Sequence, residues 1–220
     1  MRALTAAAAA LFLAVSFGAA EDSAPDVKQV VRGVEARYNR ARTLETEFFQ
    51  RYTLGPTTLV ESGRVYFQKP GRMRWDYERP EPKLFLADGQ YAYLYVPAEK
   101  QVRRQSLKQA PEYQAAFALL FGRVNFGRLF GQIGLVDVHR PEEPTRWQLR
   151  GRARSDQQSF TEIWFDVNER FQVLRVELRQ RDGSLLEFHF LGWRENHPLD
   201  PELFRLSVPP GTAWLEDAPQ

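Results

Sequence analysis

The run LADGQYAYLYVP, from Leu86 to Pro97, contains an Asp-Gly pair followed by a tyrosine at every second position. An Asp-Gly pair favours a tight hairpin turn, because glycine readily adopts the positive φ that such a turn needs. Alternate side chains of a strand point to opposite faces of a sheet. Tyr91, Tyr93 and Tyr95 therefore share one face, and the smaller apolar residues between them share the other. The run predicts an antiparallel hairpin and leaves open which face is covered by protein.

The same alternation extends along most of the chain, and it is interrupted by helical periodicity at residues 27–41 and by a continuous apolar run with helix-forming residues at 115–121. Short turns between neighbouring strands favour antiparallel pairing, so the fold class is mainly β with helices (α+β). The glycine-rich residues 122–134 are expected to be loose or broken. The predicted elements are a helix over 27–41, strands over 44–52, 65–67, 73–77, 83–87 and 90–96, a helical segment over 115–121, strands over 147–152, 160–167, 174–178 and 186–190, and a last strand over 204–208.

The first 20 residues have the pattern of a secretory signal peptide. Arg2 supplies a positive charge, residues 3–17 are apolar, and small residues at 18–20 precede an acidic pair. The apolar run is short for a membrane span. We therefore expect residues 1–20 to be cleaved, leaving an exported, soluble mature chain of residues 21–220 that forms a single domain.

Composition argues against several classes of protein. Without Arg2 the 30 basic residues become 29, against 28 acidic residues, whereas a nucleic-acid-binding protein would carry a clear basic excess. The chain has no cysteine and three scattered histidines, so it offers no thiolate nucleophile and no local metal-binding pattern. It also has no nucleophile elbow, phosphate-binding loop or dinucleotide fingerprint. We expect no catalytic residues, no metal and no cofactor.

Several ordered motifs resemble the LolA family, the periplasmic carriers of outer-membrane lipoproteins. The resemblance is strong between residues 44 and 102 and weak between 106 and 160. It rests on QKPGRMRW (68–75), LADGQ (86–90), YVP (95–97), the Gln-Val pair at 101–102 and FRLSVPPG (204–211).

The resemblance implies an incomplete antiparallel β-barrel, covered by a helical lid over an apolar cavity that shields the acyl chains of a lipoprotein. The lid helices would be residues 27–41 and 115–121. The family also implies partners for a monomeric carrier, namely an inner-membrane ATP-driven release complex and an outer-membrane lipoprotein acceptor. The residues expected to line the cavity are Phe48, Phe67, Met73, Trp75, Tyr93, Tyr95, Phe117 and Leu120.

A basic residue before the proline of the first motif holds the lid shut in this family. The matching residue is Lys69, where well-known members have arginine. Lysine is a point charge, whereas arginine presents a planar fork of donors, so the resemblance implies a weaker latch at Lys69. Arg72 and Arg74 are nearby alternatives.

Two other functions fit the same sequence. A protein of the same fold could bind or chemically modify another hydrophobic molecule, such as a glycolipid or a small metabolite. Its cavity would need polar groups, and tyrosines with an ordinary pKa near 10 are poor bases. A sensor of mislocalised lipoproteins is the third hypothesis, and that class usually carries a further domain.

Overall fold

Twelve strands form one sheet in the computed structural model, which describes residues 26–107, 124–136 and 145–216. The order across the sheet is β12-β6-β5-β4-β3-β2-β1-β11-β10-β9-β8-β7. The strands are β1 (Thr43–Leu54), β2 (Thr57–Gln68), β3 (Arg72–Arg79), β4 (Lys83–Asp88), β5 (Tyr91–Val96), β6 (Gln101–Ser106), β7 (Phe130–Val136), β8 (Trp147–Ala153), β9 (Phe160–Val167), β10 (Val173–Gln180), β11 (Leu185–Glu195) and β12 (Ala213–Glu216).

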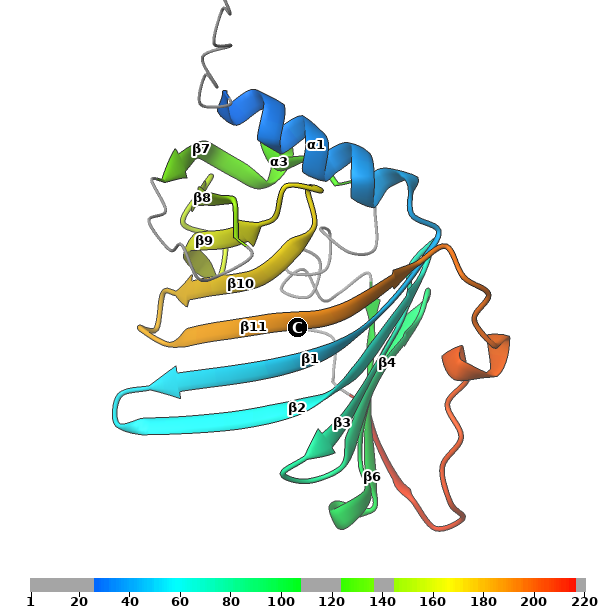
Figure 1. Ribbon diagram of the computed structural model, residues 1–220. Coiled ribbons are helices and arrows are strands. Elements are labelled where there is room, and N and C mark those ends of the chain that lie inside the picture. Colours follow the sequence, from blue (N-terminus) through cyan, green and yellow to red (C-terminus); the bar gives the residue numbers. More distant parts are fainter. Residues whose placement is uncertain (1–25, 108–123, 137–144, 217–220) are drawn as a thin grey trace, which may run out of the picture.

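The sheet is strongly curved and does not close into a barrel (Figure 1). Its two outermost strands are β7 and β12, and every neighbouring pair is antiparallel except β12 with β6. A β-bulge at Ser62/Gly63 contributes to the bend, because bulges increase local twist. A Cβ at Gly63 would lie 1.9 Å from the carbonyl oxygen of Asp76, so β3 can approach β2 this closely only beside a glycine.

One long helix, α1 (Val27–Arg40), lies across one end of the curved sheet (Figure 1). Asp26 caps its first turn by accepting a hydrogen bond from the backbone N–H of Lys28. The helix buries an apolar stripe formed by Val30, Val34 and Tyr38, spaced as one face of a helix requires. It therefore covers the adjacent face of the sheet with its own apolar side chains.

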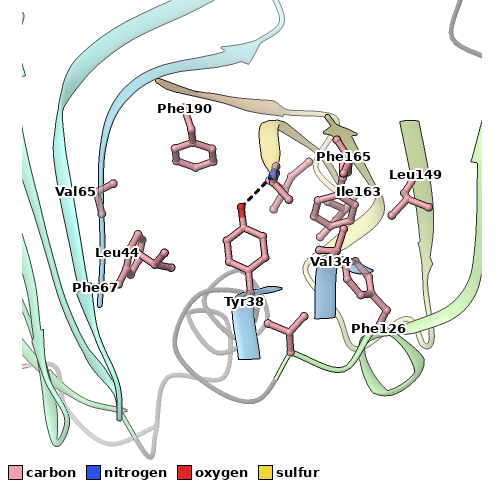
Figure 2. Close-up of a cluster of buried hydrophobic side chains, with 14 of the residues drawn as sticks. Val34, Tyr38, Leu44, Val65, Phe67, Phe126, Leu149, Ile163, Phe165 and Phe190 are labelled. Carbon is pink, nitrogen blue, oxygen red and sulfur yellow. Dashed lines mark hydrogen bonds between the residues drawn. The ribbon is translucent and has the colours of Figure 1, made fainter. Parts of the chain in front are cut away.

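Two clusters of apolar side chains lie on opposite faces of the sheet. The larger cluster lies beneath α1, and Figure 2 shows Tyr38 pointing between Leu44 and Phe67 on one side and Ile163 and Phe165 on the other. We call this face of the sheet the inner face. The smaller cluster packs on the opposite, outer face, around residues of β4 and the short 3-10 helix η3 (Pro201–Phe204).

Most predicted elements are present, including the first helix and the hairpin at the Asp-Gly pair between β4 and β5. Two predictions were wrong. Residues 204–208 do not form a strand, because Phe204 and Leu206 pack on the outer face of the sheet instead of pairing with a neighbour. Part of the segment expected to be loose forms the short helix α3 (Phe126–Leu129) and β7, where Gly131 lies close to the backbone of Arg154. The 3-10 helix η1 (Pro97–Glu99) joins β5 to β6.

Candidate functional site

Four of the predicted cavity residues come together on the inner face. The register of β1, β2 and β3 puts Phe48, Phe67, Met73 and Trp75 on this face, and each side chain is buried. The Trp75 ring meets Phe48 edge-on at 4.8 Å between centroids and Phe67 at 6.0 Å. Its indole N–H donates to the sulfur of Met73. These residues form a continuous apolar surface, which the protein fills with its own side chains in this structure.

The exposure of the side chains on the inner face increases along β1. Near α1 the inner-facing residues Leu44 and Phe48 are 2% exposed. Farther along, towards the β1–β2 hairpin, Leu54 of β1 and Leu59 of β2 are 43% and 42% exposed. With Tyr52, they form what we call the rim of the inner face. An apolar ligand could reach the rim directly, whereas the Phe48 region is buried.

The prediction that Tyr93 and Tyr95 line the cavity was wrong, because both lie on the outer face. Their partners across the β4–β5 hairpin are Leu86 and Leu84, which belong to the smaller cluster with Phe204. The inward residues of β5 are those between the tyrosines, as the pairing of Ala92 with Ala87 indicates.

Tyr93 instead supports the Asp-Gly turn. Its hydroxyl donates to a carboxylate oxygen of Asp88 at 3.0 Å, and Asp88 also accepts from the backbone N–H groups of Gln90 and Tyr91. Burial and the bond to Asp88 raise the pKa of Tyr93 to about 12. A phenol with this pKa stays neutral and cannot act as a base, so Tyr93 has a structural role. The remaining two predicted residues, Phe117 and Leu120, lie outside the described residues, as does the predicted helix over 115–121.

Lys69 contacts the helix that covers the inner face. Its ammonium group donates a hydrogen bond to the backbone carbonyl of Tyr38, in the last turn of α1. Burial lowers the pKa of Lys69. The alternatives point elsewhere: Arg74 pairs with Asp76 and donates to the carbonyl of Leu203 on the outer face.

Arg72 is the other nearby basic residue, and it donates to the side chain of Gln68. Among these three basic residues, the described hydrogen bonds therefore connect Lys69 to α1.

Comparison with known proteins identifies the family. The family description "Outer membrane lipoprotein carrier protein LolA" matches residues 39–207. The chain belongs to the LolA family. An outer-membrane lipoprotein carrier protein from Cupriavidus taiwanensis is 30% identical over 217 residues, 96% of this chain and 96% of that protein. A protein of the same name from Nitrosospira multiformis is 29% identical over 181 residues, 80% of this chain and 84% of that protein.

The fold is shared with a solved structure of low sequence similarity. The crystal structure of an uncharacterized conserved protein from Thermus thermophilus superposes with a TM-score of 0.55 and 14% identity, covering 86% of this chain and 98% of that one. Within the part of this LolA-family chain that the structure describes, no helix is both long and apolar enough to cross a membrane. The described His, Asp and Glu residues form no group of three or more that could hold a metal ion.

Sequence reasoning missed a polar cluster on the inner face of this LolA-family protein. It consists of Gln50, Glu61, Tyr77 and Lys83, which we call the polar quartet. Gln50 interrupts the otherwise mostly apolar inward series of β1, and Glu61 is its direct cross-strand partner. The polar residue Gln50 is visible in the sequence of β1. Its pairing with Glu61 depends on the register of β1 with β2, which the sequence does not specify.

Proposed function

We propose that this protein carries outer-membrane lipoproteins through the periplasm with their acyl chains held against the inner face. The supporting observation is that α1 packs on the inner face beside Leu44 and Phe67, in the same apolar cluster as Phe48 and Trp75, and that the sheet is not closed. Exposing a methylene group to water costs about 0.8 kcal/mol, so an acyl chain of about 14 carbons costs on the order of 10 kcal/mol. A carrier must remove this surface from water and later release it, and a movable helix over an apolar face meets both needs.

The contacts of α1 suggest how it would open. Towards one side of the sheet, the Tyr38 hydroxyl accepts from the backbone N–H of Val173 at 3.0 Å, and Arg37 pairs with Glu195. Towards the other side, Lys69 bonds to the Tyr38 carbonyl. We infer that α1 stays with β10 and β11 while it separates from the β2–β3 turn. Lys69 then acts as the latch, and cargo replaces α1 over the inner face.

The protein follows a defined route through the cell envelope in this proposed function. The protein is exported by a signal peptide at residues 1–20 and works as a monomer in the periplasm. It receives lipoproteins from an inner-membrane ATP-driven release complex and passes them to an outer-membrane acceptor. It needs neither a cofactor nor a catalytic residue, because only non-covalent contacts with the acyl chains change between the loaded and empty states.

A release assay tests this function. Inner-membrane vesicles that hold a labelled lipoprotein are mixed with purified residues 21–220, and the soluble fraction is analysed for a one-to-one complex. The Cupriavidus taiwanensis relative provides a comparison for vesicle competence. We expect a soluble complex with this protein. Vesicles that release lipoprotein to the relative but not to this protein would contradict the proposal and point to another hydrophobic ligand.

A further inference from the structure

The polar quartet is a connected set of side chains in an apolar surrounding. The Tyr77 hydroxyl donates to the amide oxygen of Gln50 at 3.2 Å, and the Gln50 amide donates to Glu61 at 3.0 Å. Glu61 also forms an ion pair with Lys83, whose ammonium group lies 4.3 Å from the centre of the Tyr77 ring. The Glu61 side chain is 7% exposed and the Lys83 side chain 27% exposed. The quartet thus joins a buried carboxylate to a cation that water can still reach.

The quartet lies between the covered and exposed parts of the inner face. Along β1, Gln50 follows the buried Phe48 by two residues, about 7 Å, and precedes the rim residue Tyr52 by the same distance. Phe48 contacts the Tyr77 ring edge-on at 5.0 Å. A lipid whose acyl chains lie on the inner face, from the Phe48 region to the rim, would therefore bring its carbonyl groups within reach of the quartet.

The ion pair is not explained by stability alone. Removing two charges from water costs free energy that their attraction often fails to offset, so apolar residues of similar volume commonly stabilise a fold equally well. Such a pair on an apolar face is better explained by a ligand that uses it. The buried Glu61 fixes the position of the Lys83 ammonium, since it holds one of the three N–H donors.

Lys83 has donor capacity for that ligand. Within the described residues, its ammonium group contacts the Glu61 carboxylate and the face of the Tyr77 ring. An ammonium group has three donors, and one serves Glu61. The acceptors that accompany acyl chains in a lipid are the carbonyl oxygens of the ester or amide bonds that attach them.

We propose that Lys83, held by Glu61, binds an ester or amide carbonyl oxygen of the lipid carried by this protein. This inference rests on the proposed function and adds a polar recognition site to it. The acyl chains supply most of the affinity, because they bury the larger apolar area. Lys83 fixes the depth of the lipid in the protein and distinguishes acylated lipids from hydrocarbons without carbonyl groups.

A pair of matched lipids tests the proposal. Dipalmitoylglycerol has two ester carbonyls, whereas dihexadecylglycerol has ether links and no carbonyl. The affinity of residues 21–220 for each lipid is measured by displacement of the fluorescent apolar probe bis-ANS. A hydrogen bond from a charged donor predicts that the ester lipid binds about tenfold more tightly than the ether lipid.

The double variant Glu61→Gln/Lys83→Met removes both charges without leaving one unpaired. Its affinity for each of the two lipids is expected to equal the affinity of the wild-type protein for the ether lipid. The control variant Glu47→Gln/Arg64→Met removes an ion pair between β1 and β2 on the outer face, and it should keep the preference. Circular dichroism and thermal unfolding check that each variant is folded.

The outcomes separate this inference from the proposed function. Equal binding of the two lipids by wild-type protein, or an unchanged preference in the folded Glu61→Gln/Lys83→Met variant, would overturn the role of Lys83 and leave the carrier function standing. If neither lipid displaces bis-ANS from the wild-type protein, both the role of Lys83 and the carrier function would be contradicted.

Discussion

The ammonium group of Lys69 donates a hydrogen bond to the backbone carbonyl of Tyr38, 2.5 Å away, in the last turn of α1. Carbonyls in the last turn of a helix lack partners within the helix, and a cation there also complements the helix dipole. The hydroxyl of the same tyrosine accepts from the backbone N–H of Val173 at the start of β10. Tyr38 thus connects the β2–β3 turn to the other side of the sheet through α1.

Replacing Lys69 by methionine is expected to loosen α1 without unfolding the sheet. The change removes one charged hydrogen bond, and because the group is partly exposed we expect a loss of about 1–2 kcal/mol. Amide hydrogen exchange in α1 should accelerate, and lipoprotein should pass more readily to the acceptor. Arg72→Met is the matched control, since Arg72 bonds to Gln68 and not to α1. If amide hydrogen exchange in α1 and lipoprotein transfer to the acceptor are unchanged in Lys69→Met, Lys69 does not act as the latch.

Replacing Tyr38 by phenylalanine removes the acceptor of the buried Val173 N–H. An unsatisfied buried donor costs about 1–3 kcal/mol, so urea denaturation should show a loss of free energy of unfolding in this range. Burial raises the pKa of the Tyr38 phenol, so the hydroxyl remains neutral and the loss should not vary with pH near neutrality. A Tyr38→Phe protein as stable as wild type would indicate that water or another group satisfies Val173.

Leu59 and Val60 offer a comparison between the two faces at equal exposure. Leu59 is 42% exposed at the rim, and Val60 is 40% exposed on the outer face. An aspartate at either position should change the free energy of unfolding by only about 0.5 kcal/mol, as is usual at the surface. Leu59→Asp should weaken acyl-chain binding in the bis-ANS displacement assay, and Val60→Asp should not. Equal effects of the two variants would argue against an inner-face path for the lipid.

His189 is expected to make stability depend on pH. Burial, and then the positive charge of Arg175, lower its pKa below the ordinary value of 6.5. Between the lowered pKa and 6.5 the unfolded chain binds more protons than the native protein, so stability falls as pH decreases through this window. Denaturation of His189→Gln between about pH 8 and about pH 5 should show a smaller loss of stability on acidification than wild type. If the stability of the two proteins depends on pH in the same way, the lowered pKa of His189 is contradicted.

The sequence alone predicted most elements of the fold, because strand alternation and turn residues are local properties. It could not predict which face of the tyrosine strand points inward, since alternation assigns residues to two faces without saying which face is covered. The structure answers this with the pairing of Tyr93 to Leu86 on the outer face. The pattern over 204–208 also fits a strand, and only tertiary packing shows that Phe204 is a core residue without strand pairing.

The shared face of four candidate site residues was predicted for the same reason. Phe48, Phe67, Met73 and Trp75 do share the inner face, but Met73 is fully buried in the described structure. A charge at Met73 would therefore destabilise the fold, which is why the rim residue Leu59 gives a cleaner test of lipid binding. The polar quartet could not be predicted, because it depends on the cross-strand pairs of Gln50 with Glu61 and of Tyr77 with Lys83.

In the proposed carrier, the acyl chains lie on the inner face of the sheet. The most direct measurement is photo-crosslinking in the soluble complex with a lipoprotein whose acyl chains include tritiated palmitate. A benzophenone amino acid is placed at Leu59 on the inner face or at Val60 on the outer face. We predict that the label is captured from Leu59 and not from Val60. Capture from Val60 alone, or equally from both positions, would contradict this placement of the acyl chains.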